Sequence, residues 1–214
     1  MASIYDLKPR FQALLRPLTN WLAGRGVTAN QVTLAAVLLS LATGALVVAD
    51  PSSRIVLLSV PAVLFLRMAL NAVDGMLARE HGMKTRLGAV LNELGDVVAD
   101  AGLYLPLALV PGVSAIGVTL VALLGIISEM AGVVAVQIGA DRRYDGPLGK
   151  SDRAFAFGCV FFLLGCGVEP GKWLDVVWWI MAALSAVTIV NRSRRALEIA
   201  ASSPSGNTDS QRTK

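Results

Sequence analysis

The chain has 214 residues, of which 55% are hydrophobic, and it carries a formal net charge of +4. A mean hydropathy of +0.62 excludes an ordinary soluble domain, and so small a net charge gives little support to a nucleic-acid partner. Cys159 and Cys166 lie seven residues apart in one apolar segment, and nothing around them resembles a disulfide framework or a zinc site. The sequence therefore predicts a single-domain protein of the lipid bilayer.

The N-terminal segment, residues 1–29, is predicted to be an amphipathic helix followed by a linker. Between residues 4 and 23, apolar side chains recur at helical spacing with basic residues among them. The apolar set is Phe11, Leu14, Leu15, Leu18, Trp21 and Leu22. This pattern is typical of a helix in the cytoplasmic interface of a membrane, and packing against the rest of the protein is the alternative. After Gly24 and Gly26 end this helix, Thr28 or Asn30 is expected to cap the next one.

Residues 30–195 are predicted to form six transmembrane helices. Polar punctuation divides this region into six apolar segments, each near the roughly 20 residues that cross a bilayer. The expected spans cover residues 30–49, 54–78, 86–110, 113–138, 154–168 and 173–190. Pro106 marks an expected kink in the third span, and a charged loop covers residues 141–153. The fold class is thus all-α, and the tail at 196–214 is expected to be disordered.

Basic residues gather in the loops on one side of these spans. That side holds Lys8, Arg10, Arg16, Arg25, Arg79, Lys84, Arg86, Arg142, Arg143, Lys150, Arg153, Arg192, Arg194 and Arg195. The opposite side holds Arg54 and Lys172. By the positive-inside rule, both termini and the loops of the first side face the cytoplasm, which predicts a multi-pass protein of the inner (cytoplasmic) membrane.

Polar residues concentrate between Asn71 and Asp100, where two predicted spans meet the cytoplasmic side. Asn71 and Asp74 are three residues apart, which places them on one face of a helix. Asn92, Asp96 and Asp100 recur every four residues and form a second polar stripe. An ionisable group beside a bilayer core costs roughly 2.5–3.5 kcal/mol on insertion scales. Several together therefore predict a functional site at the mouth of the membrane.

This stretch resembles the signature of the CDP-alcohol phosphotransferase family, D-x2-D-G-x2-A-R-x8-G-x3-D-x3-D. The matching residues, all with the correct gaps, are Asp74, Gly75, Ala78, Arg79, Gly88 and Asp96. Asn71 and Asn92 stand where the family has its first and third aspartates. A register shifted by four residues would use Asn92, Asp96 and Asp100 instead, but it loses Gly88 and lengthens the loop.

By this resemblance, the protein transfers a phosphatidyl group from CDP-diacylglycerol to an alcohol and releases CMP. The resemblance implies one or two divalent cations, Mg²⁺, Mn²⁺ or Ca²⁺, because hard cations prefer oxygen ligands. It assigns metal binding to Asn71, Asp74, Asn92 and Asp96. It assigns nucleotide contacts to Asp74, Gly75, Ala78, Arg79 and Gly88. Asp96 takes the place of the family's general base, and the family also implies a homodimer.

The two asparagines change what this site is expected to do. An amide oxygen ligates a hard cation without the charge of a carboxylate, so two negative charges are missing from the family pattern. We expect a centre that holds one ion tightly and recruits a second with the diphosphate of the donor. An inactive member of the family is the alternative interpretation.

Further charged residues lie near this region. Arg67 and Asp100 are predicted to form an ion pair beneath the site, since each lies one turn deeper than a motif residue. Glu129 is either a further carboxylate of the pocket or a hydrogen-bonded packing group. Three basic residues are candidates to hold a phosphate on the acceptor: Lys150, Arg153 and Arg195. The competing explanation is that their charges orient the protein in the membrane.

Two other functions are compatible with parts of the sequence. The first is an enzyme of the same family that moves a head group from a soluble CDP-alcohol to a lipid alcohol. The second is a small ion-coupled transporter that uses the intramembrane carboxylates. The D-G-x2-A-R core disfavours the transporter, because transport does not require that spacing.

Overall fold

The computed structural model describes residues 4–202, and every regular element in this range is helical. The elements are α1 (Ile4–Gly24), α2 (Ala29–Ala49), α3 (Arg54–Glu80), α4 (Arg86–Tyr104), the 3₁₀ helix η1 (Leu105–Leu109), α5 (Ala115–Gln137), α6 (Lys150–Gly165) and α7 (Lys172–Ser202). The all-α prediction is confirmed, and an α-helix lies at each of the six predicted spans. By length and composition, four helices in the described range qualify as membrane spans, namely α2, α3, α5 and α7.

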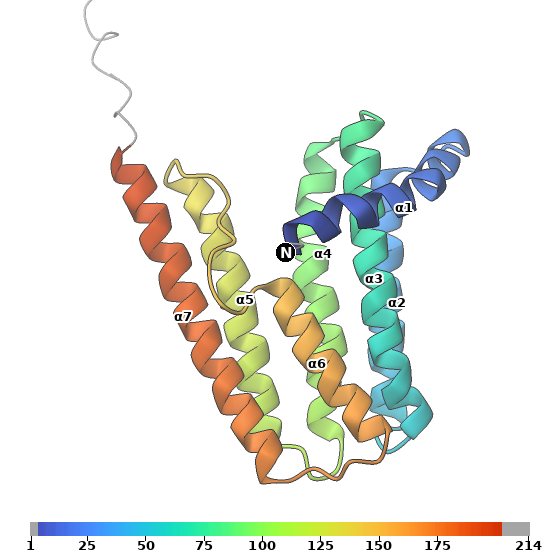
Figure 1. Ribbon diagram of the computed structural model, residues 1–214, viewed down its shortest axis with the longest axis vertical. Helices are drawn as coiled ribbons and strands as arrows, with labels where there is room; N and C mark the ends of the chain where they lie inside the picture. Colours follow the sequence, from blue (N-terminus) through green and yellow to red (C-terminus); the bar gives the residue numbers. More distant parts are fainter. Residues whose placement is uncertain (1–3, 203–214) are drawn as a thin grey trace, which may run out of the picture.

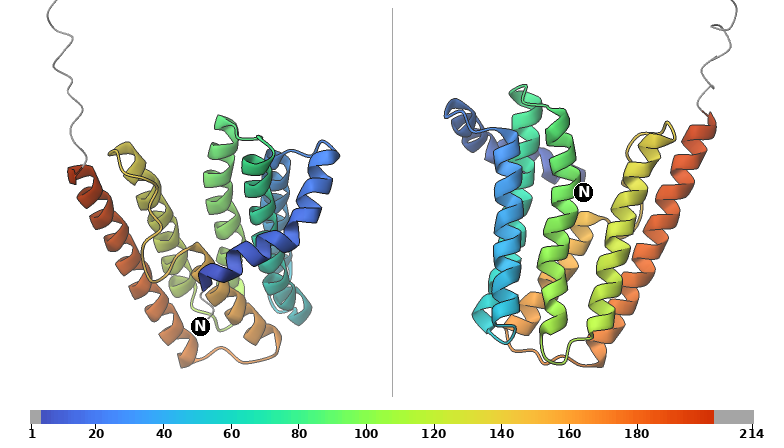
Figure 2. Two further views of the ribbon diagram at one scale, coloured as in Figure 1. Left: turned by 45° about the horizontal axis from the view of Figure 1, so that its top comes forward. Right: turned by 180° about the vertical axis from the view of Figure 1, so that it is seen from behind.

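The helices form two groups that diverge toward one end of the molecule (Figure 1). α2, α3 and α4 stand side by side, while α5 and α7 form a pair (Figure 2). α6 packs mainly on α3 and lies between the two groups. α1 crosses near the end of α3, where Arg16 pairs with Glu80 at 3.0 Å. The polar end of the bundle therefore opens between two groups of helices.

Local sequence explains where α2 and α4 begin. Thr28 caps α2 by accepting a hydrogen bond from the backbone N–H of Gln31, and the Gln31 side chain accepts one from the N–H of Thr28. Thr85 caps α4 in the same way, since its hydroxyl oxygen accepts from the N–H of Gly88 at 2.9 Å. These caps fix the starts of α2 and α4, and Thr85 lies within the motif between Arg79 and Gly88.

A close crossing between α2 and α4 depends on two glycines and a proline. Pro106 has no N–H to donate to the carbonyl of Gly102, so the α-helix ends at Tyr104 and η1 follows. The Gly102 carbonyl points at Gly44 of α2, where an added Cβ would lie only 1.9 Å from its oxygen. The sequence predicted one kinked span over 86–110, whereas the structure changes helix type at Leu105.

Two boundaries differ from those expected from the apolar runs. α6 begins at Lys150, so Lys150 and Arg153 lie in its first turn and not in a loop. α7 continues to Ser202, so residues 196–202, expected as tail, are helical. Ala196 packs with Ala135 and Ala140, which gives this polar extension of α7 a buried face. Residues 203–214 of the expected tail and residues 1–3 lie outside the described residues.

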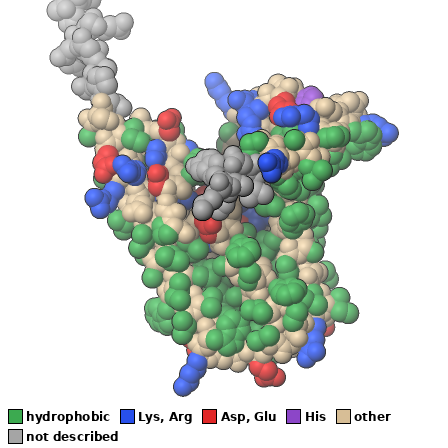
Figure 3. All heavy atoms as spheres, viewed as in Figure 1, with side chains coloured by type: hydrophobic (Ala, Val, Ile, Leu, Met, Phe, Trp, Pro, Cys, Tyr) green, Lys and Arg blue, Asp and Glu red, His purple; other side chains and the backbone are tan. Residues whose placement is uncertain are grey.

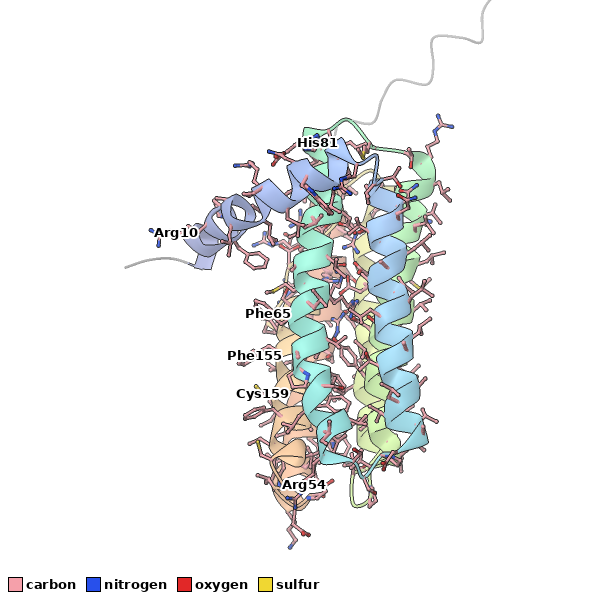
Figure 4. All side chains as sticks on the ribbon, turned by 90° about the vertical axis from the view of Figure 1, so that its right-hand side faces the viewer. Arg10, Arg54, Phe65, His81, Phe155 and Cys159 are labelled. Atoms are coloured by element: carbon pink, nitrogen blue, oxygen red, sulfur yellow. The ribbon has the colours of Figure 1, made fainter. Side chains whose placement is uncertain are left out.

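The surface carries a broad apolar belt between two charged ends, of which the upper one holds more charges (Figure 3). Exposed members of this belt include Leu38, Ile55, Phe65, Ile116 and Trp179. Arg54 and His81 mark the opposite ends of α3 (Figure 4). An apolar surface of this extent belongs in contact with lipid. The chain is thus a multi-pass membrane protein.

Candidate functional site

The polar stripes of α3 and α4 meet at the charged end of the bundle. Asn71 lies on α3 and Asp96 on α4, and the Asn71 Nδ2 donates a hydrogen bond to Asp96 Oδ1 at 3.3 Å. Helical spacing places Asp74 one turn from Asn71 on the same side of α3. The structure therefore brings Asn71 and Asp96, which are 25 residues apart, into direct contact.

Asp74 is buried and held by a residue that the sequence did not single out. Its Oδ2 accepts a hydrogen bond of 2.8 Å from the hydroxyl of Thr33 on α2. Thr33 is itself buried, so this contact fixes the direction of the Asp74 carboxylate. The only sequence signal for Thr33 is its position one turn after Ala29 on the buried face of α2.

Asp96 is half-buried and lies between two cationic side chains. The Lys150 Nζ, from the first turn of α6, contacts Asp96 Oδ1. The Arg67 Nη2 lies 3.6 Å from the same oxygen and donates to the backbone carbonyl of Asp96 at 3.1 Å. Arg67 also pairs with Asp100, with 2.5 Å between Nη1 and Oδ1, and both side chains are buried. Arg67 thus ties α3 to α4 directly beneath Asp96.

The predicted nucleotide-contacting residues lie toward the end of α3 and at the start of α4. A Cβ added to Gly75 would lie 3.1 Å from the Arg79 Nη2, so the guanidinium lies over the bare Cα of this glycine. A Cβ added to Gly88 would lie 2.6 Å from Asn30 Oδ1 at the start of α2. Arg79 is exposed, and Ala78 is half-buried. Gly75 thus makes room for Arg79 on its own helix, and Gly88 lets the starts of α2 and α4 approach each other.

The oxygen donors of the site fit a hard divalent cation, although few of them are charged. Asp74 and Asp96 supply carboxylates, and Asn71 and Asn92 supply amides. Asn92 is exposed on α4 and has no hydrogen bond to another described residue. Among residues 4–202, no group of three His, Cys, Asp or Glu side chains is placed to hold a metal. A donor set of oxygens alone suits Mg²⁺, Mn²⁺ or Ca²⁺.

A second group of charges lies across from this site, on α4 to α7. In this group, three arginines converge on the carboxylate of Glu129. The distances are 2.9 Å from Arg153, 3.3 Å from Arg142 and 3.4 Å from Arg192. Arg142 also pairs with Glu93 at 2.5 Å. We call these five residues the Glu129 cluster.

Arg192 was missed by the sequence analysis, which had named Arg195 instead. Arg192 is buried on the face of α7 that also carries Ser185 and Thr188, a helical spacing that predicts an inward side chain. Arg195 is 64% exposed and pairs with Glu198 one turn away. The structure thus places Arg192, and not Arg195, beside Arg153.

The loop before α6 completes the second group. Arg192 donates to the backbone carbonyl of Asp145 at 3.3 Å. Two hydrogen bonds of 2.8 Å from Arg143 lower the pKa of the Asp145 carboxyl. Gly146 adopts φ of 127° directly against Thr188, where a side chain would clash. The loop is therefore held against α7 by specific contacts.

An apolar groove of about 700 Å³ runs between α3 and α6 and ends at the site. Phe65, Phe155 and Cys159 lie along its outer edge (Figure 4). Its polar end is formed by Arg67, Asn71 and Lys150. The remaining lining residues are Pro61, Leu64, Met68, Ser151, Ala154, Gly158, Phe162 and Leu163. The groove thus joins the lipid-facing surface to Asn71, the hydrogen-bond partner of Asp96.

The chain is a multi-pass helical bundle. It carries a stripe of carboxylates and amides at one end, and an apolar groove leads to this stripe. Together these features define a membrane-embedded site for a polar reaction on a lipid. The sequence profile of one family, CDP-alcohol phosphatidyltransferase, matches residues 26–190. The chain belongs to this family and is a CDP-alcohol phosphotransferase. The family assignment confirms the resemblance seen in the motif and argues against the transporter alternative.

Individual proteins also resemble this chain in sequence or in fold. The chain is 46% identical over 199 residues to the Inner membrane protein YnbA of Escherichia coli K12, covering 93% of this chain and 98% of YnbA. Its fold is similar to that of the Mycobacterium tuberculosis phosphatidylinositol phosphate synthase PgsA1 with CDP-DAG bound. That similarity has a TM-score of 0.70 at 22% identity and covers 84% of this chain and 92% of PgsA1. A PgsA1 structure in complex with manganese and citrate gives a TM-score of 0.70 at 23% identity, covering 85% and 88%.

Proposed function

We propose that the protein transfers the phosphatidyl group of CDP-diacylglycerol to the hydroxyl of an alcohol and releases CMP. The observation that carries this proposal is the apolar groove between α3 and α6. Its outer part suits acyl chains, and its polar end lies at Asn71 and Lys150, next to Asp96. The groove supports a lipid substrate, and in the alternative reaction the lipid alcohol would occupy it.

In the proposed reaction, Asp96 accepts the proton of the acceptor hydroxyl. The hydroxyl oxygen forms a bond to the phosphorus of the phosphatidyl group, and the bond from that phosphorus to the oxygen of CMP breaks. Lys150 and Arg67 flank Asp96, where they compensate negative charge and fix its position. Asn71 donates to Asp96 Oδ1, which leaves Oδ2 as the oxygen for the proton.

The nucleotide and metal are assigned to the rim of the same site. Asp74, with Gly75, Ala78, Arg79 and Gly88, forms the side that takes the cytidine diphosphate. The residues that would hold one or two Mg²⁺ or Mn²⁺ ions are Asn71, Asp74, Asn92 and Asp96. When bound, a divalent cation polarises the phosphoryl oxygens and stabilises the leaving CMP. The manganese in the PgsA1 complex supports this class of cofactor.

The two free cysteines offer a matched test of the groove. Both are exposed, but Cys159 lines the groove and Cys166 lies at the end of α6, outside it. In single-cysteine variants, we expect CDP-diacylglycerol to slow maleimide labelling of Cys159 and to leave labelling of Cys166 unchanged. A soluble CDP-alcohol should protect neither. Equal labelling of Cys159 with and without CDP-diacylglycerol would show that the groove does not bind this donor.

We also propose that all six helices α2 to α7, apart from η1, span the inner membrane, with both termini and the site on the cytoplasmic side. α1 then lies in the cytoplasmic interface. The larger number of charges at one of the two ends of the surface supports this orientation (Figure 3). Cysteines introduced near Lys84 and Arg143 should react from the cytoplasm, and one near Lys172 from the periplasm. Periplasmic labelling near Lys84 would contradict the orientation.

A homodimer is part of this proposal. α4 exposes an apolar stripe at helical spacing: Leu87, Val90, Leu94 and Val98. Such a stripe beside the site suits contact with a second copy of the chain as well as with lipid. A cysteine introduced at Leu94 should give a covalent dimer on cross-linking, at low protein concentration and in nanodiscs large enough for one dimer. A protein that stays monomeric under these conditions would contradict the homodimer.

A further inference from the structure

We infer that the Glu129 cluster closes the acceptor side of the site to phosphorylated alcohols, so that the acceptor is an alcohol without a phosphate. This inference rests on the proposed transfer to an alcohol and makes Glu129 a residue that determines acceptor specificity. It reverses the role that basic residues alone suggested for Lys150, Arg153 and Arg195.

The first support is that Glu129 occupies the place where an anion would bind. Clusters of guanidinium groups are the common binding site for phosphate, because their N–H groups match its oxygens. Here the three guanidinium groups of Arg142, Arg153 and Arg192 already surround the buried carboxylate of Glu129, at 2.9 to 3.4 Å. The protein thus supplies its own anion to this cluster.

The second support is that many of the arginine donors already have partners within the protein. Arg153 donates to the hydroxyl of Ser128 at 2.9 Å, and Arg192 donates to the Ser128 carbonyl at 2.5 Å and to the Asp145 carbonyl at 3.3 Å. Both arginine side chains are buried. A phosphate that needs several of their N–H groups would therefore have to displace these contacts.

The third support is that the cations around the site have carboxylate partners. Lys150 pairs with Asp96, Arg67 with Asp100, and Arg142 with Glu93. Arg153 and Arg192 share Glu129. A phosphate dianion would have to enter beside these carboxylates, and like charges at short range repel strongly where water is excluded. A neutral alcohol meets no such repulsion.

The fourth support is that the backbone of α5 is shaped for this arrangement. Gly125 and Gly132 lie one turn to either side of Glu129. A Cβ at Gly125 would lie 2.9 Å from Arg153 Nε, and one at Gly132 would lie 3.4 Å from Arg192 Nη1. The two glycines therefore make room for the arginines to reach the carboxylate, which marks the cluster as a built feature of the helix.

The test compares acceptors that differ by one phosphate. Glycerol and glycerol 3-phosphate, and inositol and inositol phosphate, are given with CDP-diacylglycerol, and CMP release is measured. Binding of glycerol 3-phosphate is measured separately by calorimetry, which needs no turnover. The variants are Glu129→Gln, which removes the charge, and Glu198→Gln, which removes an exposed carboxylate on α7 as a matched control.

We expect wild type to use unphosphorylated alcohols in preference to their phosphates and to bind glycerol 3-phosphate only weakly. Glu129→Gln should bind glycerol 3-phosphate at least about tenfold more tightly, since one negative charge is lost from a buried cluster. Glu198→Gln should match wild type. Glu129→Asp keeps the charge and should keep the weak binding of the phosphate.

Preference of wild type for a phosphorylated acceptor would overturn the inference, and so would equal glycerol 3-phosphate binding by wild type and a folded Glu129→Gln. If Glu129→Gln does not fold, the inference is decided by wild type alone, from its binding of glycerol 3-phosphate and its use of glycerol and glycerol 3-phosphate as acceptors. If wild type releases no CMP with any alcohol, the proposed function fails, while the binding comparison still judges the role of Glu129.

Discussion

The two polar regions of this protein use charge in opposite ways. On α3 and α4, carboxylates alternate with amides, and Asn71, Asn92 and Asp96 are partly or fully exposed. In the Glu129 cluster, each arginine is paired, and Glu129, Arg153 and Arg192 are buried. A region that binds ligands must keep polar groups within their reach, whereas buried charges need partners inside the protein. The comparison therefore assigns chemistry to the first region and selection to the second.

The largest expected effect comes from the carboxylate in the first region. Asp96→Asn keeps the shape of the side chain and its contact with Lys150 but removes the proton acceptor. Loss of a general base lowers turnover by roughly 10²–10⁴-fold. Turnover and CDP-diacylglycerol binding should be measured on the same preparation, with the exposed Asp175→Asn as control. Near-normal turnover of Asp96→Asn would shift the role of base to another group, with Asp100 as the next candidate.

A second prediction contrasts a buried ion pair with an exposed one. Arg67→Met removes the nearer cation of Asp100, at 2.5 Å, and leaves only Arg153 at 3.6 Å. Breaking a buried pair on one side costs about 3–5 kcal/mol of folding free energy, and we expect the lower end of this range because Arg153 remains. Arg16→Gln breaks the exposed pair with Glu80 and should leave the unfolding midpoint in detergent unchanged. Equal midpoints for the two variants would mean that the Arg67 pair does not lock α3 to α4.

A third prediction concerns the crossing of α2 and α4. Gly44→Ala places a Cβ against the Gly102 carbonyl and should cost about 1–3 kcal/mol, because a backbone atom cannot move aside easily. Gly158→Ala is the matched control, since its Cβ would meet the Leu64 side chain at an ordinary 3.5 Å. Denaturant unfolding compares the two. A Gly44→Ala protein as stable as Gly158→Ala would show that the helices do not cross this closely.

The smallest expected effect is on metal affinity. The double variant Asn71→Asp, Asn92→Asp adds two negative charges to the site. In wild type the Asn71 amide donates a hydrogen bond to Asp96, so Asn71→Asp also replaces this bond by repulsion between two carboxylates. We expect Mn²⁺ to bind the empty double variant roughly tenfold more tightly or better. Because binding is reciprocal, metal and CDP-diacylglycerol should strengthen each other most in wild type. The control variant is Asn191→Asp on α7. If calorimetry shows that wild type without CDP-diacylglycerol binds two Mn²⁺ ions tightly, this role of the asparagines is contradicted.

The sequence predicted what depends on spacing along one helix. Asn71 and Asp74 share a face of α3, and the glycine and arginine positions of the motif follow fixed gaps, so local periodicity defined the candidate site. The boundaries of α2, α3 and α5 also followed from composition. The end of α7 did not follow from composition. Polar residues end the apolar run near residue 190, but the helix continues because Ala196 packs against other residues.

The predicted ion pair between Arg67 and Asp100 is present, but the other contacts between helices far apart in the sequence were not predictable. The hydrogen bond from Thr33 to Asp74 joins residues 41 apart, and that from Arg192 to Ser128 joins residues 64 apart. Basic residues in loops have the same appearance whether they bind a ligand, orient the chain in the membrane or pair with a buried carboxylate. Only the packing of α5 against α7 shows that Arg192 points inward and Arg195 outward.

The most direct measurement is the release of CMP from CDP-diacylglycerol by purified wild type, with labelled lipid product identified in the same reaction. Mn²⁺ or Mg²⁺ is added or chelated, and a soluble CDP-alcohol with diacylglycerol serves as the competing substrate pair. We expect release that requires the metal, CDP-diacylglycerol and an unphosphorylated alcohol, and that is lost in Asp96→Asn. Release from the soluble CDP-alcohol alone, or release that Asp96→Asn retains, would contradict a phosphatidyl transfer at the α3–α4 site.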